Sequence, residues 1–322
     1  MKTSRVEKKM GAATRDAYGQ ALVEVGRNNP NIVVLDGDVS GSTKSKAFAK
    51  EFPKRFFNFG IAEANMVSAA AGLASCGKIP FASSFAAFLV NKSFEQLRMS
   101  IANPCLNVKL CGSHSGISLG PDGASQMAIE DISLICSLPK FVVLVPADEV
   151  AAKALVHQAA TYDGPVYIRT SRSSSPLIYS SGESFIIGQA KVLREGRDVT
   201  VIGTGLLVWE ALEVAQIYEA KGIHIRVIDV HTVKPIDEEA IIAAARETGA
   251  IVTAEEHLTV GGLGSRVAEV VVRNHPVPME FIGVHETYAE SGKPHELFER
   301  YGLTSNHINR AIDRVLKRKS GK

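Results

Sequence analysis

The sequence contains no hydrophobic run of 18 residues, the length that a membrane-spanning helix needs, and no excess of charge of either sign. Its formal net charge is +2 with acidic and basic residues interspersed, so no basic stripe favours nucleic acid or a membrane surface as a partner. No hydrophobic segment of signal-peptide length follows the charged first residues. We therefore expect a cytoplasmic protein that binds neither nucleic acid nor membrane.

Cysteine is also scarce, with four residues and no pair at CxxC spacing, so nothing indicates a disulfide framework. Cys76, Cys105, Cys111 and Cys136 lie in or beside apolar runs, and we expect reduced thiols in the core. The chain has 322 residues, of which 45% are hydrophobic and 22% charged. This composition is typical of an ordinary globular protein of about two domains.

Helical periodicity and short apolar runs alternate along the chain, which predicts an α/β fold with mostly parallel sheet covered on both faces. In the first half, helices are expected at 12–27, 64–75, 93–102, 128–138 and 149–161, and strands at 32–35, 79–83, 108–111, 141–145 and 166–170. In the second half, strands are expected at 199–202, 225–230, 251–254 and 280–284, and helices at 206–221, 237–248, 264–273 and 306–319. A serine-rich stretch at 171–184 predicts a linker between two domains, 8–178 and 188–320.

Two glycine patterns resemble nucleotide-binding motifs without meeting their requirements. Gly203 and Gly205 follow an expected strand, but Val208 stands where a dinucleotide-binding motif has its third glycine. The run from Gly261 to Gly264 opens a helix without the Lys and Ser or Thr of a phosphate-binding loop. Neither pattern is interpreted as a nucleotide site.

A glycine-rich loop at 111–126 holds His114, Asp122 and Gln126 between an apolar run and a helical pattern. In α/β proteins, ligands bind at the loops that follow the strands. A loop with four glycines and few charges is poorly explained as a mere linker. We therefore expect a functional site in this loop.

Glu63 precedes a nearly charge-free helix of small residues, and two interpretations of its carboxyl group stay open. The carboxyl stabilises the helix N-terminus, or, desolvated by apolar neighbours such as Ile61 and Met66, it shares a proton with a heterocycle nitrogen. Phe85 and Phe88 are three residues apart, so a helical turn presents both rings on one face. Core packing and stacking on a ligand explain that pair equally well.

The stretch 57–172 resembles the pyrimidine-binding domain of transketolase, a thiamine-diphosphate enzyme, and the second half resembles the transketolase C-terminal domain. The resemblance is carried by Ile-Ala-Glu-x-Asn-Met, Ser-Phe-x-x-Phe, Gly-Ser-His-Ser-Gly and Gly-Pro-Asp-Gly-Ala-Ser-Gln. Many transketolases have a second histidine where this chain has Gln126, so contact with cofactor or substrate is implied there rather than proton transfer. The resemblance implies these roles: catalytic Glu63 and His114, cofactor-binding Glu63, Phe85, Phe88 and Gln126, and substrate-binding His114 and Asp122.

The same resemblance implies a site for the terminal phosphate of a sugar substrate. Arg15 in Ala-Ala-Thr-Arg, Ser42 in Gly-Asp-Val-Ser-Gly-Ser-Thr and Arg172 in Ile-Arg-Thr-Ser-Arg match the family residues that hold this phosphate with His114. Two guanidinium groups and a hydroxyl suit a tetrahedral dianion. Taken singly, each arginine is also a residue type common on solvated surfaces.

The diphosphate-binding domain of the family is not recognisable in this sequence. Gly37 and Asp38 with Asn65 resemble its metal motif, but Val39 replaces the required glycine and Asn65 belongs to the Glu63 helix, so we expect no metal site. The resemblance therefore implies the C-terminal subunit of a split transketolase, with the diphosphate and Mg²⁺ or Ca²⁺ held by a separate N-terminal subunit. It also implies a heterotetramer with a homodimer contact between C-terminal subunits, acting on sugar phosphates of the pentose phosphate pathway.

The implied reaction transfers a two-carbon ketol unit from a ketose phosphate to an aldose phosphate, with Glu63 promoting the imino tautomer of the aminopyrimidine. Three alternatives stay open: a beta subunit of a 2-oxo acid dehydrogenase, deoxyxylulose-phosphate synthase, and a non-catalytic regulatory subunit. The loop from His114 to Gln126 and the arginines matched to phosphate binding argue against the first. The second is typically one chain with the missing domain attached. Joint retention of Glu63, His114, Asp122 and these arginines argues against the third. Residues 255–257 (Glu-Glu-His) are expected to be core and surface residues without chemistry.

Overall fold

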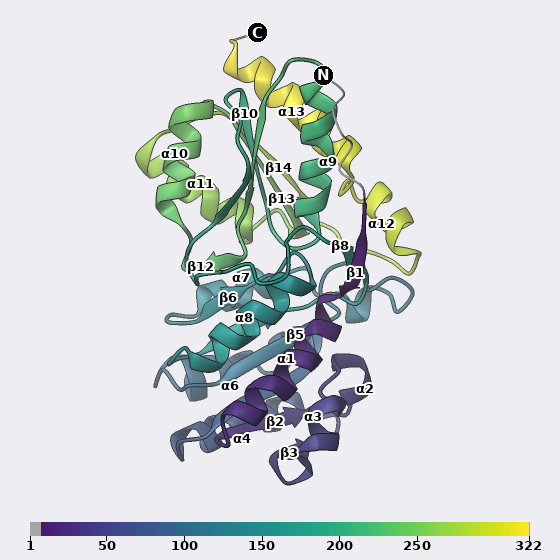
Figure 1. The fold of residues 1–322 in the computed structure, drawn as a ribbon, viewed down its shortest axis with the longest axis vertical. Helices are drawn as coiled ribbons and strands as arrows, with labels where there is room; N and C mark the ends of the chain where they lie inside the picture. The colour runs from purple at the N-terminus through teal and green to yellow at the C-terminus, as the bar shows by residue number, and fades with distance from the viewer. Residues whose placement is uncertain (1–7, 322) are drawn as a thin grey trace.

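The computed structural model describes residues 8–321, which form two α/β domains stacked along the long axis of the molecule (Figure 1). The predicted fold class is confirmed. The first domain holds a seven-stranded sheet that is parallel except for one edge strand. Its strand order is β12 (Thr232–Lys234), β6 (Val142–Leu144), β7 (Val166–Arg169), β5 (Lys109–Ser113), β4 (Ile79–Phe85), β2 (Ile32–Asp36) and β3 (Phe56–Asn58).

Strand β2 shows how this sheet is buried on both faces. Ile32 and Val34 pack on one face with helices α1 (Thr14–Asn28) and α8 (Glu149–Thr161). Val33 and Leu35 pack on the other face, because side chains alternate along a strand. That second face is covered by α4 (Glu63–Ser75), α5 (Ala86–Asn91) and α7 (Asp131–Ser137). The unbroken run Ile-Val-Val-Leu is what a strand covered on both faces requires.

The structure adds short elements that periodicity does not predict. Besides β3, α5 and β12, given above, they include β1 (Met10–Ala13), α2 (Ser40–Thr43), α3 (Lys46–Glu51), the turn η1 (Pro53–Arg55), β8 (Ser174–Pro176), β9 (Lys191–Arg194) and α12 (Pro294–Arg300). Strands β1 and β8 pair antiparallel, so the stretch 171–184 is wrong as a plain linker. Its serines carry no apolar alternation, and backbone pairing with a distant strand leaves no local signal.

Two predicted helices differ in the structure. The helix expected at 93–102 is a short α6 (Phe94–Gln96) followed by a π-helical segment, η2 (Leu97–Ala102). The helix expected at 128–138 begins only at Asp131, because Ala128 is engaged in a bridge with Ser115. Helix α8, by contrast, matches the predicted range 149–161.

The second domain is a five-stranded sheet with helices on both faces. Its strand order is β14 (Met279–Val284), β13 (Ile251–Leu258), β10 (Val199–Gly203), β11 (Ile225–Asp229) and β9, with only β9 antiparallel. Helices α9 (Leu207–Glu219) and α13 (Ser305–Lys319) share one core, and α10 (Glu238–Thr248) and α11 (Leu263–Asn274) share the other. Strand β13 runs past its predicted end at residue 254 to Leu258.

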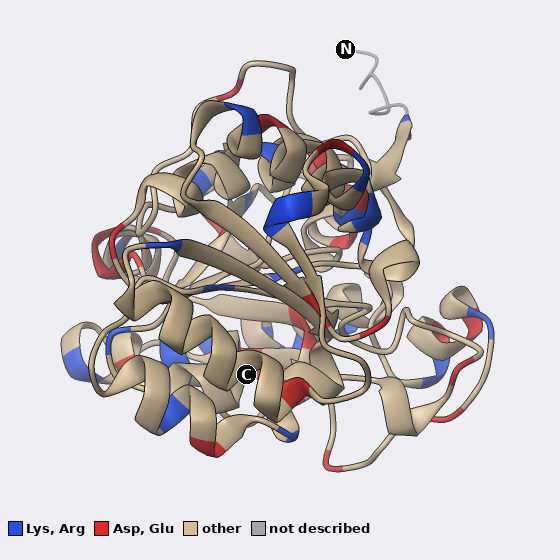
Figure 2. Cartoon of the chain, turned by 90° about the horizontal axis from the view of Figure 1, so that it is seen from below, with Lys and Arg blue, Asp and Glu red and all other residues tan. Residues whose placement is uncertain are grey.

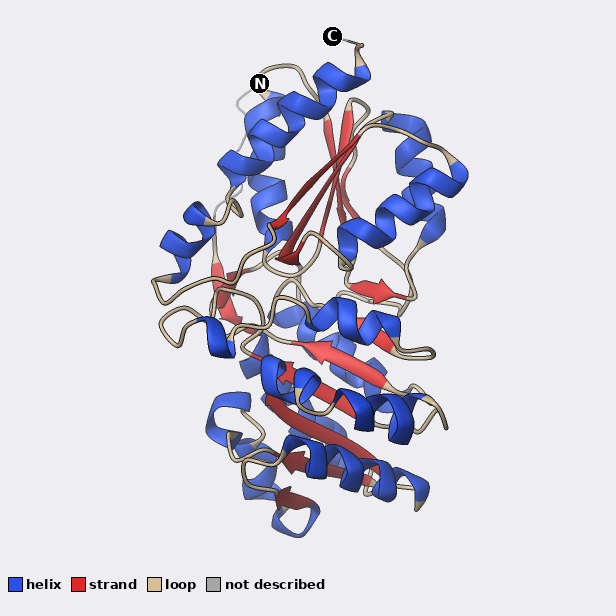
Figure 3. Cartoon of the chain, turned by 180° about the vertical axis from the view of Figure 1, so that it is seen from behind, coloured by secondary structure: helices blue, strands red, loops and turns tan. Residues whose placement is uncertain are grey.

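The parallel strands of the second sheet point their carboxyl ends at the first domain (Figure 3). Strand β12, which lies in the range predicted for the second domain, pairs with β6 at the edge of the first sheet. A backbone bond from Val145 N to the His231 oxygen, 2.9 Å long, continues this contact. The two domains therefore share sheet structure as well as side-chain contacts.

The distribution of charged residues agrees with the sequence prediction, and so does the burial of the cysteines except for Cys76. Figure 2 shows Lys and Arg interspersed with Asp and Glu around the chain. Cys111 is buried and Cys105 and Cys136 are half-buried, but Cys76 is exposed, so the prediction of a core thiol is wrong there. Cys76 caps the end of α4, where the chain leaves the core. Within residues 8–321, no helix is both long and apolar enough to cross a membrane.

Candidate active site

The candidate site lies where the parallel strands of the first sheet end. Strands β4 and β5 end at Phe85 and Ser113, so Phe85 and His114 leave the sheet at the same edge. Arg172 follows β7, which neighbours β5, and Arg15 lies in the first turn of α1. Because the carboxyl ends of neighbouring parallel strands meet at one edge, the topology gathers side chains that are distant in sequence.

Arg15 and His114 contact each other at this edge. Arg15 Nη1 lies 2.7 Å from His114 Nε2 and donates to the Ser42 carbonyl oxygen at 3.2 Å. Since a guanidinium has only donors, Nε2 accepts, and the neutral ring carries its proton on Nδ1. Burial, with repulsion from Arg15, Arg172 and Lys44, lowers the pKa of His114 to about 3 and keeps the ring neutral.

These two contacting side chains also keep unpartnered polar atoms. His114 Nδ1 and Arg15 Nε are buried and have no hydrogen-bond partner in the described part of the chain. Buried polar groups are nearly always paired, so two such donors favour a ligand rich in acceptors. His114 also has a left-handed backbone, with φ 59°, and strain of this kind concentrates at functional sites.

Arg172 ties the strand edge to the 111–126 loop. Its Nη1 donates to the Leu119 carbonyl oxygen at 2.9 Å and lies 3.3 Å from Asp122 Oδ1. The side chains of Arg172 and Asp122 are 37% and 32% exposed, so their ion pair contributes little, about 0–1 kcal/mol. Both groups therefore stay available to a ligand.

Glu63 is the first residue of α4 and is only 3% exposed. Its Oε1 accepts from Ser84 Oγ at 3.2 Å, and its Oε2 lies 3.4 Å from Lys92 Nζ. A Cβ added at Gly37 would lie 3.7 Å from Oε1, so the backbone there approaches the carboxyl closely. A carboxyl that served only the helix N-terminus gains nothing from this burial, and the placement favours the ligand-binding interpretation.

Phe85 and Phe88 stack with ring centroids 5.8 Å apart and planes 26° from parallel. Phe85 also meets the His114 ring edge-on, with centroids 4.3 Å apart. Lys92 Nζ, which pairs with Glu63, lies 4.2 Å from the centroid of the Phe88 ring. The aromatic pair therefore joins the Glu63 group to the Arg15 and His114 group in one continuous cluster.

Gln126 ends a 3₁₀ turn, η3 (Ala124–Gln126), and is half-buried. Two residues later, Ala128 packs against Ala86, Ala87 and the partly buried Phe88. The loop thus returns to the aromatic pair, which brings Gln126 near it. The contact of Gln126 with a ligand stays a prediction.

Sequence reasoning did not single out Ser84 and Lys92, the two partners of Glu63. Lys92 stands four residues after Phe88 at the end of α5, a spacing that places both on one helical face, and this signal was present. Asp38 Oδ1 accepts from Asn58 Nδ2 at 2.7 Å, and Asn65 is exposed on α4. Across residues 8–321, no group of three or more His, Cys, Asp or Glu side chains is arranged to hold a metal ion.

The prediction for residues 255–257 is wrong in placing glutamates at the surface. Glu255 and Glu256 are 1% and 4% exposed, and His257 is fully buried. The extension of β13 beyond residue 254 carries them into the contact between the domains. Burial raises the pKa of Glu256 to about 7, although the nearby Arg169 opposes this shift.

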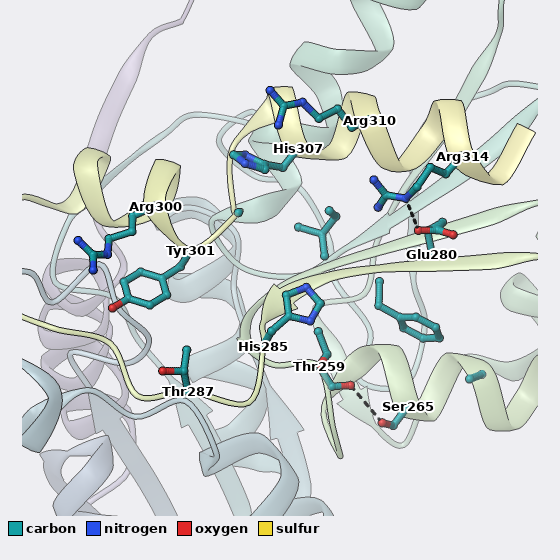
Figure 4. A pocket seen from close by; sticks show the side chains of 14 residues that line it. Thr259, Ser265, Glu280, His285, Thr287, Arg300, Tyr301, His307, Arg310 and Arg314 are labelled. Atoms are coloured by element: carbon teal, nitrogen blue, oxygen red, sulfur yellow. Dashed lines mark hydrogen bonds and ion pairs between the residues drawn. The ribbon is translucent and has the colours of Figure 1, made fainter.

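A cavity of about 870 Å³ lies elsewhere, in the second domain between β14 and α13 (Figure 4). Its lining includes Arg300, Tyr301, His307 and Arg310, and it contains none of the predicted site residues. Convergent polar groups with unpaired atoms and shifted pKa values identify a reactive site better than volume does. The candidate site is therefore the cluster at the edge of the first sheet.

The structure brings a buried carboxyl, an aromatic pair and two arginines to the region where the strands of the first sheet end, and comparison with known proteins gives the class of protein to which this fold belongs. Residues 10–176 match the family "Transketolase, pyrimidine binding domain", and residues 188–308 match "Transketolase, C-terminal domain". The chain belongs to the transketolase family, whose members depend on thiamine diphosphate.

Three relatives narrow the resemblance to split enzymes. The chain is 43% identical to the "Putative transketolase C-terminal section" of Methanocaldococcus jannaschii, over 94% of this chain and 96% of that one. It is 42% identical to the "6-deoxy-6-sulfo-D-fructose transketolase subunit SqwH" of a Clostridium species, over 95% of each. The solved structure titled "Split gene transketolase, inactive beta4 tetramer" superposes with a TM-score of 0.90 at 50% identity, covering 96% of this chain and all of that one. The alternatives considered from the sequence are not favoured by these relatives.

Proposed function

We propose that this chain is the pyrimidine-binding subunit of a two-chain transketolase that moves a two-carbon ketol unit from a ketose phosphate to an aldose phosphate. The observation that carries the proposal is the continuous cluster that runs from Glu63 through Phe88 and Phe85 to His114 and Arg15. In this proposal the carboxyl at one end of the cluster shares a proton with the cofactor, and the residues at the other end bind an anion. This is what a cofactor with a flat heterocycle and a phosphorylated substrate both need.

The residues at one end of the cluster fit the aminopyrimidine of thiamine diphosphate. A buried carboxyl with one hydroxyl donor and one mobile ammonium as partners suits a ring nitrogen, and the stacked phenyl rings suit a flat heterocycle. In this proposal Glu63 holds the proton at that nitrogen, and Phe85, Phe88 and Gln126 contact the cofactor. Bound there, thiamine diphosphate supplies the nucleophilic carbon for cleavage and formation of the carbon–carbon bond.

The residues at the other end fit a sugar phosphate. Arg15, Ser42 and Arg172 bind the terminal phosphate in this proposal, and neutral His114 donates from its unpartnered Nδ1. Asp122 orients a substrate hydroxyl from the loop. Phosphate binding then holds the reacting end of the sugar in position, so that binding energy contributes to the rate.

The assembly is also part of the proposal. A separate N-terminal subunit holds the diphosphate and Mg²⁺ or Ca²⁺, and two C-terminal subunits contact each other in a heterotetramer that serves pentose phosphate interconversion. Support comes from relatives named as a transketolase section, a transketolase subunit and a split-gene transketolase.

Ketol transfer from xylulose 5-phosphate to ribose 5-phosphate tests the proposal, with thiamine diphosphate and Mg²⁺ present. The chain is assayed alone and mixed with the N-terminal chain, and 6-deoxy-6-sulfo-D-fructose serves as a second donor because one relative is named for it. We expect activity only in the mixture, and its loss with Glu63→Gln. Glu24→Gln is the matched control, since Glu24 pairs with Lys153 and His157 on the surface away from the cluster.

Each outcome has one meaning. An inactive mixture with both sugar donors that decarboxylates a 2-oxo acid would favour the dehydrogenase alternative. A mixture that does neither would leave a regulatory subunit as the better interpretation.

A further inference from the structure

Each of the last three residues of β13 bonds the first domain, either within the 111–126 loop or just after it. The contacts are Glu256 Oε1 with Ser118 N at 2.5 Å, His257 Nε2 with Ser133 N at 3.3 Å, and Leu258 N with the Ile129 oxygen at 2.8 Å. Two of these contacts lie after the loop, and the Glu256 contact lies inside it. The second domain therefore holds the loop at one point within it and holds the segment that follows it.

The Glu256 contact is the most constrained of the three. Glu256 is 4% exposed, and its carboxyl accepts the backbone N–H of Ser118. A Cβ at Gly116, whose φ is +72°, would lie 2.2 Å from Glu256 Cδ. The loop backbone thus rests directly on this carboxyl, with no room for a side chain between them.

Arg169 fixes the backbone of Glu256. Its Nη2 donates to the Glu256 carbonyl oxygen at 2.9 Å and to the Ala128 oxygen at 3.0 Å. Its Nε donates to Asp131 Oδ2 at 2.8 Å, and both charged side chains are buried. One guanidinium therefore joins the end of β13 to the segment that follows the loop, and its buried hydrogen bonds restrict the motion of both.

The first domain bonds the loop at other atoms. Gly116 N donates to the Ala128 oxygen at 2.8 Å, and Ser173 Oγ donates to the Ser118 oxygen at 3.1 Å. Ser115 N and Oγ both donate to the Thr170 oxygen, which fixes the residue next to His114. Farther along, Arg172 bonds the Leu119 oxygen, but the Arg172 side chain is 37% exposed. The Ser118 N–H is bonded by the second domain.

We propose that Glu256 is a positioning residue through which the second domain holds the substrate loop, and so places His114 and Asp122 for the sugar. The inference rests on the proposed function only for the roles of His114 and Asp122. It assigns the second domain a task in the reaction without a contact to cofactor or substrate. Loss of the bond is expected to loosen the loop before it affects the rest of the fold.

Glu255 provides a matched control next in the chain. It is as deeply buried as Glu256, but its oxygens accept from Leu263 N at 2.7 Å and Gly264 N at 2.8 Å, at the start of α11. Its bonds therefore stay inside the second domain. Substitution of Glu255 removes the same chemical group at the same depth without touching the loop.

Hydrogen–deuterium exchange of the full chain tests the proposal without any need for activity. With Glu256→Ala, amides of residues 116–120 are expected to exchange about tenfold faster or more, because the buried Ser118 N–H loses its acceptor and the loop loosens around it. Glu256→Gln keeps an acceptor and is expected to keep protection within about threefold of the wild type. Glu255→Ala is expected to speed exchange in 263–266 and to leave 116–120 unchanged.

Glu256→Asp covers the case in which the alanine variant does not fold. It keeps the charge but shortens the side chain by one methylene, so the Ser118 bond lengthens and the loop still loosens. The proposal is overturned by loop exchange that stays unchanged in the folded variants. It is equally overturned by exchange in β2 that rises as much as exchange in the loop.

A kinetic measurement on the two-chain enzyme separates positioning from cofactor binding. Glu256→Ala is expected to raise KM for the ketose phosphate about tenfold while calorimetry gives an unchanged Kd for thiamine diphosphate. A parallel weakening of cofactor binding would contradict a role confined to the loop. An inactive wild-type mixture would defeat the proposed function alone, since the exchange result does not depend on it.

Discussion

The two domains have the same architecture but use the carboxyl edge of their sheets in opposite ways. In the first domain this edge carries Glu63 at the start of α4 and the segments of His114 and Arg172, which follow β5 and β7. In the second domain the same edge is covered by the first domain. There Thr204 Oγ1 lies 3.5 Å from the Val145 oxygen, and Tyr179 Oη donates to Asp229 Oδ2 at 2.6 Å.

The difference shows why a doubly covered sheet does not specify a function by itself. Ligands bind at the carboxyl edge of such sheets when the edge is open. In the second domain the edge is used for docking, and the buried Asp229, whose pKa burial raises to about 7, serves that contact. We therefore expect the chemistry in the first domain, although both sheets are built from the same βα units.

Replacing Glu63 is expected to have the largest effect on activity. It tests whether the chemistry takes place at the carboxyl edge of the first sheet, called the open edge below. Glu63→Ala should lower kcat of the two-chain enzyme by about 10²–10⁴-fold, the usual worth of a positioned proton-sharing group. Chain association, followed by sedimentation, should be unchanged. An enzyme that kept more than a tenth of its rate would remove Glu63 from the chemistry.

Replacing Arg15 or Arg172, the arginines of the proposed phosphate site, is expected to have the next largest effect. Arg15→Ala and Arg172→Ala should each raise KM for a phosphorylated ketose by about ten- to a hundredfold, because each loses a charged hydrogen bond to the phosphate. With a ketose that lacks phosphate, the variants and the wild type should have similar KM. Equal losses with both donors would show that the arginines act on structure rather than on phosphate.

Protonation of His114 is expected to have a smaller effect, which is measured as a change in the free energy of unfolding with pH. Burial lowers its pKa from 6.5 to about 3, so the unfolded chain binds the proton more readily between these values. The stabilisation by neutral His114 is complete above pH 6.5 and is lost as pH falls from 6.5 towards 3. Between pH 7 and pH 5, wild type should lose about 1–2 kcal/mol more than His114→Asn in the free energy of unfolding by urea.

Asparagine is chosen for that comparison because it tolerates the left-handed backbone at this position. Other groups that titrate between pH 7 and pH 5 contribute to both proteins alike and cancel in the difference. If wild type and variant lost the same free energy, the His114 ring would be protonated in the fold or exposed to water. Either result would remove the neutral donor from the proposed phosphate site.

Sequence patterns predict the parts of this chain that local chemistry determines. The apolar runs of β2, β4, β5 and β7 and the periodicity of α8 are buried on account of their own residues, and the structure has them close to the predicted places. The stretch Ser174–Pro176 becomes strand β8 only because β1 lies beside it, and nothing in its own residues indicates this. Pairing between distant segments is set by the tertiary fold.

Some features of the candidate site likewise have a local sequence signal, whereas others depend on contacts between distant segments. His114 and Asp122 lie in a loop whose glycines mark it locally, and Glu63 lies at a helix start. The partnership of Glu63 with Ser84 and that of Glu256 with Ser118 join elements that are far apart in sequence. Glutamate is usually exposed, so the sequence alone predicts Glu256 at the surface. In the structure Glu256 is buried in the contact between the two domains.

The smallest effect is expected in the second domain, at the cavity between β14 and α13. Arg310 is exposed there and contacts no residue of the candidate site. Arg310→Ala should change kcat/KM of the two-chain enzyme by less than about twofold and the stability by less than about 0.5 kcal/mol, as surface substitutions usually do. The kcat/KM of Arg15→Ala, the same substitution at the open edge, should be measured in parallel for comparison. A tenfold loss with Arg310→Ala would break the contrast between the domains, because it would place a contribution to the reaction outside both the open edge and the docking contact.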